Sequence, residues 1–202
     1  MIRFERDGAL WIATIARPDK ANSLTGAMLH ELADFASEAA GSARALVLTG
    51  EGRVFSAGAD LDEARAGLAT DGVWERLSGA IADAPILTIA ALNGTLAGGA
   101  MGMALACDLR IATPGARFFY PVMKLGFLPQ PSDPKRLRAL VGPARAKMIL
   151  MAGQKIEAPE ALSWGLIDRI VDADLLEEAR ALAKDTLAAT PTHVAGIKRL
   201  VE

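Results

Sequence analysis

The stretch ALNGTLAGGAMGMALACDLRIA, residues 91–112, decides the fold class of this chain. It continues a buried strand predicted over residues 86–92 and then passes through a glycine-rich turn. Small residues over 100–107 predict a closely packed helix, and the last four residues predict another buried strand. A strand, a helix and a strand in this order are typical of the right-handed crossovers of α/β domains.

The flanking sequence alternates strands and helices in the same way. Asp7-Gly8 between two apolar runs favours a hairpin. Apolar residues at helical spacing after Ser23 and Thr25 predict a helix that either of these residues caps and that ends at Gly41. Further predicted elements are strands over residues 2–6, 9–16 and 45–48, helices over 134–140, 143–151, 159–164 and 174–189, and a strand-like segment over 166–171.

Composition narrows the class of protein. The chain has 202 residues, a net charge of −2 and 51% hydrophobic residues, which fits one folded domain and excludes an intrinsically disordered chain. A near-neutral charge argues against a nucleic-acid partner. One cysteine, Cys107, excludes an internal disulfide, and with two histidines we expect no metal site.

No segment has the pattern of a membrane span or a leader peptide. The apolar region of residues 84–107 is interrupted by Pro85, Asn93 and several glycines. The first eight residues carry charges where a signal peptide has its apolar core. We therefore expect a cytoplasmic protein with no membrane partner.

Two glycine-bearing turns are the candidate functional elements. They are residues 55–61 (FSAGADL) and residues 93–100 (NGTLAGGA), and each follows a predicted strand and opens a helix. Small side chains let a ligand approach the backbone, and unpaired N–H groups at helix starts can hold an oxyanion. Tight turns serving structure alone would have the same pattern. Neither turn matches a nucleotide-binding glycine motif, so a phosphate loop has weak support.

Several motifs in order resemble the enoyl-CoA hydratase/isomerase family, also called the crotonase superfamily. The motifs are residues 17–18 with 21–24 (RP and ANSL), 55–61, 93–99 continuing through 104–112, and 160–168 (EALSWGLID). The resemblance runs from residue 2 to about residue 200. It implies a spiral of repeated β-β-α units over residues 1–172, a shortened helical segment over 173–202, and a homotrimer or hexamer.

The resemblance also implies an acyl-CoA ligand, with coenzyme A as part of the substrate and no separate cofactor. The backbone N–H groups of Ala59 and Gly99 align with the oxyanion hole of the family. Arg17 and Arg53 are basic residues near the segments that face the coenzyme. The coenzyme-binding positions implied are Ala21, Arg53, Ala57, Ala59, Asp60, Leu61 and Gly99.

Two catalytic positions depart from the family. The glutamates that flank a water in the hydratases align with Gly102 and Val122, neither of which can carry a proton. Two-glutamate hydration therefore does not follow. An isomerase, lyase or decarboxylase that uses the oxyanion hole alone is one expectation, and a catalytically degenerate coenzyme-binding or subunit-partner protein is the alternative. Gly102 either allows close packing against a neighbouring backbone or leaves room for an acyl group, a water or an anion.

The sequence also makes predictions for Tyr120, for Asp133 and for the predicted helix over residues 174–189. Tyr120, the only tyrosine, either packs or donates a hydrogen bond to the acyl site. Asp133 before Pro134 is typical of a turn residue. The predicted helix over 174–189 has an apolar stripe that needs a partner, either the spiral of its own chain or another subunit. Because relatives continue for several helical turns beyond residue 198, we expect a more open pocket here.

Overall fold

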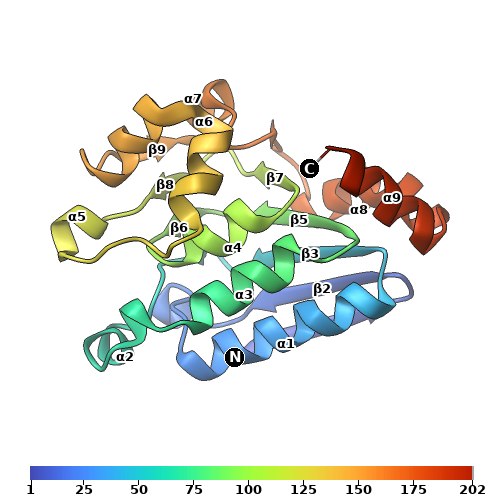
Figure 1. Cartoon of the computed structure of the whole chain (residues 1–202), viewed down its shortest axis with the longest axis horizontal. Helices are drawn as coiled ribbons and strands as arrows, with labels where there is room; N and C mark the ends of the chain where they lie inside the picture. Colours follow the sequence, from blue (N-terminus) through green and yellow to red (C-terminus); the bar gives the residue numbers. More distant parts are fainter. Residues whose placement is uncertain (202) are drawn as a thin grey trace.

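The computed structural model of the chain describes residues 1–201, which form two sheets with helices packed on them (Figure 1). The larger sheet has six strands in the order β1-β2-β3-β5-β7-β10, parallel except for the antiparallel pair β1 and β2. Its strands are β1 (Ile2–Asp7), β2 (Leu10–Ile15), β3 (Ala45–Gly50), β5 (Leu87–Leu92), β7 (Leu109–Ala112) and β10 (Arg169–Ile170). The α/β class and the Asp7-Gly8 hairpin predicted from the sequence are confirmed.

The larger sheet is buried on both faces. Along β2 and β3, alternate side chains belong to two apolar clusters, because successive residues of a strand point to opposite faces. Trp11 and Leu46 lie in the cluster under α1, α3 and α4, whereas Ile12 and Val47 lie in the cluster under α8. Burial on both faces explains why these strands read as continuous apolar runs.

The smaller sheet has four strands in the order β4-β6-β8-β9. They are β4 (Val54–Ser56), β6 (Thr95–Ala97), β8 (Arg117–Phe119) and β9 (Ile156–Glu157). Sequence patterns did not predict these strands, because two or three residues are too few to display an alternation. Gly94 permits the close approach of β4 and β6, since a Cβ there would lie 1.9 Å from the Arg53 carbonyl oxygen.

The helices cover both faces of the larger sheet (Figure 1). They are η1 (Pro18–Lys20), α1 (Gly26–Ser42), α2 (Leu61–Arg65), η2 (Leu68–Thr70), α3 (Val73–Ala82), α4 (Ala100–Ala106), α5 (Val122–Leu125), α6 (Asp133–Leu150), α7 (Ala158–Trp164), α8 (Leu175–Ala188) and α9 (Pro191–Val201). Thr25, rather than Ser23, caps α1 by accepting a hydrogen bond from the Met28 N–H. The predicted division of 134–151 into two helices appears as a break at Gly142, with φ 80°.

The apolar stripe of α8 packs against the molecule's own larger sheet. Leu175, Ala179 and Ala183 are buried in the cluster that includes Ile89 and Ile111. This resolves the two alternatives for that stripe in favour of an intramolecular partner. The stripe therefore gives no support to subunit assembly.

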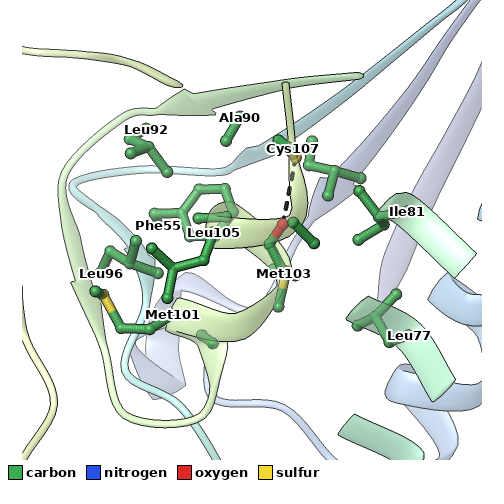
Figure 2. Packing of buried hydrophobic residues seen from close by; sticks show 14 of the residues in the cluster. Phe55, Leu77, Ile81, Ala90, Leu92, Leu96, Met101, Met103, Leu105 and Cys107 are labelled. Atoms are coloured by element: carbon green, nitrogen blue, oxygen red, sulfur yellow. Dashed lines mark hydrogen bonds between the residues drawn. The ribbon is translucent and has the colours of Figure 1, made fainter. Parts of the chain in front are cut away.

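The main core surrounds α4, whose seven residues are all buried (Figure 2). Side chains from β4, β5 and β6 meet it on one side, and side chains from α3 meet it on another. Cys107, just beyond α4, donates to the Met103 carbonyl at 3.3 Å (Figure 2). Burial raises the pKa of the Cys107 thiol to about 12, so this cysteine is a packing residue.

Arg110 on β7 joins three segments of the chain. Its side chain is buried, and it donates to the carbonyls of Cys107 and Leu166 at 2.6 and 3.0 Å. Its guanidinium also contacts the Asp168 carboxylate at 3.2 Å. The residue therefore ties the end of α4 to the segment between α7 and β10.

Candidate active site

The two glycine-bearing turns lie against each other. Gly58 and Gly98 have φ of 95° and 59°, which glycine adopts without strain. A Cβ on Gly58 would lie 3.0 Å from the Ala97 carbonyl oxygen and 3.5 Å from the Gly99 nitrogen. The structure thus brings together two segments that are 40 residues apart in the chain.

A third segment holds the first turn in place. The Ala57 N–H donates to the Ala21 carbonyl, and the Leu24 N–H donates to the Gly58 carbonyl at 2.8 Å. Asn22 is fully buried and donates through its side chain to the carbonyls of Glu51 and Val54. The residues 21–24 motif is therefore the support of the first turn.

Arg17 and Asp60 form an ion pair beside that turn. Arg17 donates to the Asp60 carboxylate at 2.7 Å and to the Ser23 carbonyl at 3.2 Å. Hydrogen bonding to Arg17 lowers the pKa of Asp60 from its usual range. Asp60 also caps α2 by accepting from the Asp62 N–H. Arg17 is thus engaged within the protein, whereas Arg53 is exposed on the loop between β3 and β4.

The N–H groups of Ala59 and Gly99 donate no hydrogen bond to any other described residue. Both belong to the abutting turns, and both residues border the same cavity. Unpaired backbone N–H groups in a partly buried position need an acceptor, because a buried donor without a partner is destabilising. These two donors belong to residues of the cavity wall.

The cavity has a volume of about 140 Å³ and an apolar lining. The backbone of the two turns forms one wall, and side chains of α2, α3 and residues 120–128 form the others. The lining residues are Ala57, Ala59, Leu61, Ala64, Ala69, Trp74, Gly98, Gly99, Tyr120, Pro121, Val122, Leu125, Phe127 and Leu128. Leu61 and Leu128 are 73% and 87% exposed, so the rim of the cavity is apolar as well.

Trp74 is a wall residue that the sequence patterns did not single out. Its ring lies where a Cβ on Gly99 would approach within 3.2 Å, and its indole N–H donates to the Leu68 carbonyl at 2.8 Å. A tryptophan on an amphipathic helix is indistinguishable from a core residue in a single sequence. Only the approach of α3 to the second turn makes it part of the site.

Behind the cavity, Tyr120 donates a hydrogen bond to Asp133. The Tyr120 hydroxyl lies 2.9 Å from the Asp133 carboxylate, and both side chains are buried. The prediction that Asp133 is an ordinary turn residue is wrong, because this residue is only 1% exposed at the start of α6. Gly102 on α4 makes its burial possible, since a Cβ there would lie 2.7 Å from Asp133 Oδ1.

The buried carboxyl has an altered acidity. Burial raises the pKa of Asp133 to about 6, and the hydrogen bond from Tyr120 opposes that rise. Burial and the neighbouring carboxylate raise the pKa of Tyr120 above its usual value, so its hydroxyl stays protonated. The space beside Gly102 is therefore occupied by the carboxyl group of Asp133.

The other candidate residues are placed as follows. Val122 lines the cavity with an apolar side chain, whereas Gly102 does not line it. His30 is exposed and contacts Arg76, and His193 lies on α9, so neither borders the cavity. No described helix is long and apolar enough to cross a membrane.

The two sheets are built mainly of parallel strands, helices pack on them, and the two glycine-bearing turns lie against each other. This architecture is the crotonase fold. The chain belongs to the enoyl-CoA hydratase/isomerase family, whose family model matches residues 5–202. It is 37% identical to a protein from Rhodobacter capsulatus named "Probable enoyl-CoA hydratase", over 98% of this chain and 79% of that one.

The chain is also similar to another curated protein and to a solved structure. The chain is 36% identical to 4-chlorobenzoyl coenzyme A dehalogenase-1 of an Arthrobacter species, over 92% of this chain and 72% of the relative. The crystal structure of enoyl-CoA hydratase from Bacillus anthracis superposes with a TM-score of 0.91 at 31% identity, covering 99% of this chain and 81% of that one.

Proposed function

We propose that this protein binds an acyl-CoA thioester with the carbonyl oxygen between the N–H groups of Ala59 and Gly99. The observation that carries the proposal is the pair of unbonded N–H groups on abutting turns, at the edge of an apolar cavity. Two donors aimed at one oxygen polarise a thioester carbonyl and stabilise the enolate formed from it. The apolar walls suit the acyl chain, and the exposed Arg53 suits a coenzyme phosphate.

In the proposed reaction the enolate is stabilised without two glutamates. At the positions that align with the glutamates of hydratases, Gly102 and Val122 supply no proton donor or acceptor. An isomerisation, a decarboxylation or a related lyase reaction needs the oxyanion hole and at most one acid–base group. Decarboxylation is favoured among these because the substrate itself supplies the carboxylate. We expect the reaction to take place in the cytoplasm, with no nucleic-acid partner.

The Gly99→Pro variant tests the oxyanion hole. Gly99 has φ −59°, a value that proline adopts, so this change deletes the N–H without requiring a new φ at residue 99. Wild type is expected to shift the absorption of a chromophoric enoyl-CoA, such as 4-dimethylaminocinnamoyl-CoA, to longer wavelength, and Gly99→Pro is expected to abolish the shift. Its dissociation constant, measured by calorimetry, should rise about 2- to 10-fold, the worth of one net hydrogen bond.

Gly99→Ala is the matched control. It adds the same Cβ beside the Trp74 ring at 3.2 Å but keeps the N–H. Its absorption shift should match that of wild type, and thermal melting should show that both variants fold. Absence of any binding of acetyl-, butyryl- or octanoyl-CoA to wild type at millimolar concentration would contradict the proposed function. Binding without any turnover of acyl-CoA substrates would favour a degenerate coenzyme-binding or subunit-partner protein.

We also propose a homotrimer or a pair of trimers. Support comes from the family resemblance and from the exposed apolar side chains of Ile197 and Leu200 on α9. Light scattering in solution should give three or six times the chain mass of 21.2 kDa. A mass equal to that of one chain over a wide concentration range would reject the assembly.

A further inference from the structure

Asp133 is a buried carboxyl group with half of its hydrogen-bonding capacity unused. Its Oδ2 accepts from the Tyr120 hydroxyl at 2.9 Å, while Oδ1 has no hydrogen-bond partner among the described residues. A buried polar atom without a partner is costly, so such atoms call for an explanation other than stability. For Asp133, we look for that explanation in the connection between its carboxyl group and the cavity.

Tyr120 connects this carboxyl to the cavity. Tyr120 lines the cavity together with Ala59 and Gly99, whereas Asp133 lies behind it. Tyr120 is thus a lining residue whose hydroxyl hydrogen-bonds Asp133, which gives a route for a proton between the cavity and the carboxyl. The hydroxyl donates to the carboxylate at 2.9 Å and accepts from the Gln130 N–H at 3.5 Å, so one lone pair of its oxygen is left for a group in the cavity.

The surroundings of the Asp133 carboxyl are compatible with a group that takes up and releases a proton. Gly102 leaves the space that Oδ1 occupies, because a Cβ there would lie 2.7 Å from that atom. The charged groups that act on the carboxyl are Glu75 on α3 and Arg136 on α6, and their effects on its acidity are opposite in sign. Burial is the dominant influence, and it favours a carboxyl that titrates near neutral pH.

We infer that Tyr120 and Asp133 act as a two-residue acid–base relay for the α-carbon of a bound acyl-CoA. The inference rests on the proposed function, because the oxyanion hole must hold the enolate oxygen. Tyr120 is the catalytic residue, since it lines the cavity proposed for the ligand, and Asp133 acts through it.

The proton balance of the relay is closed within the site. The C–H bond at the α-carbon breaks, and its electron pair forms the enolate, whose oxygen lies between the N–H groups of Ala59 and Gly99. The proton moves to the Tyr120 oxygen while the tyrosine hydroxyl proton moves to Asp133 Oδ2. Asp133 changes from carboxylate to carboxylic acid, and the reverse transfer returns a proton to carbon. Tyr120 is neutral before and after the step, and no oxidant or co-reactant is needed.

Hydrogen–deuterium exchange at the α-carbon tests the relay without knowledge of the natural reaction. Wild type with butyryl-CoA in D₂O should incorporate deuterium at the α-carbon, detected by NMR and mass spectrometry. Because the carboxylate is the accepting form, the rate should rise with pH through about 6 and then level off. Asp133→Asn and Tyr120→Phe should each slow exchange by about 10²-fold or more and remove this pH dependence.

The control distinguishes proton transfer from anchoring of the loop before α6. Ser132 donates to Glu75 through its hydroxyl at 2.6 Å, so Ser132→Ala loosens the same loop but leaves the relay intact. It should exchange deuterium at a rate that still rises with pH, unlike Asp133→Asn. Equal losses in Ser132→Ala and Asp133→Asn would show that Asp133 only anchors the loop and would overturn the relay.

The relay and the proposed function fail in different ways. Calorimetry measures binding of butyryl-CoA to wild type, Asp133→Asn and Tyr120→Phe separately from exchange, and each of the three should bind. Wild type that binds butyryl-CoA but incorporates no deuterium would overturn the relay and leave the binding proposal standing. Wild type that binds no acyl-CoA would overturn the proposed function and the relay with it.

Discussion

Crotonyl-CoA hydration by wild type is expected to be at least about 10⁴-fold slower than hydration by a family hydratase. Each general acid–base group contributes about 10²–10⁴-fold to a rate, and the positions Gly102 and Val122 supply neither group. The Val122 side chain adds an apolar surface to the cavity. The buried Asp133 carboxyl reaches the cavity only through Tyr120, so it cannot replace the pair.

The assay follows the loss of enoyl-thioester absorbance, with a family hydratase measured in parallel. Calorimetry on the same sample should show that crotonyl-CoA binds, which separates loss of chemistry from loss of binding. A turnover comparable with that of the reference hydratase would mean that the two catalytic positions have been assigned to the wrong residues.

Arg110→Met is expected to lower the free energy of unfolding by about 2–6 kcal/mol. The change leaves the buried carbonyls of Cys107 and Leu166 without the donor that now satisfies them, at about 1–3 kcal/mol for each. Methionine occupies most of the space of the side chain but offers no N–H group. The half-exposed Asp168 carboxylate can regain water, so it adds less to the loss. Urea unfolding followed by circular dichroism measures the change.

Arg117→Met is the matched control for the same chemical substitution. Arg117 pairs with Glu157 at 3.7 Å, and both side chains are more than 60% exposed. Its loss should change the free energy of unfolding by no more than about 0.5 kcal/mol. Similar changes in the two variants would contradict the structural role assigned to Arg110.

Local sequence patterns predicted most of the larger sheet and its helices. The strand of residues 45–48 is visible because β3 is buried on both faces, and the helix of residues 26–42 is visible through its cap and its apolar spacing. Both signals arise within a few consecutive residues. The smaller sheet was not predicted from these patterns, since its strands are held by partners from distant segments rather than by their own residues.

The candidate site was only partly predictable for the same reason. The two turns carry glycines at positions where the backbone needs them, so the turns were found from local sequence, whereas Ala59 and Gly99 were selected through the family resemblance. Asp133 was misread as a turn residue because Pro134 follows it, which is a local signal. Its burial depends on Gly102, which is 31 residues away in the chain and is adjacent only in the folded protein.

The sequence by itself determined the alternation of strands and helices, the two glycine-bearing turns and the presence of residues without a titratable group at positions 102 and 122. These properties belong to single residues and to short-range spacing, so they are present before the chain folds. Only the tertiary structure decided that α8 covers its own sheet, that Trp74 borders the cavity and that Tyr120 meets Asp133. Each of these contacts joins elements far apart in the chain, and packing geometry alone determines which of the many possible partners lies within reach.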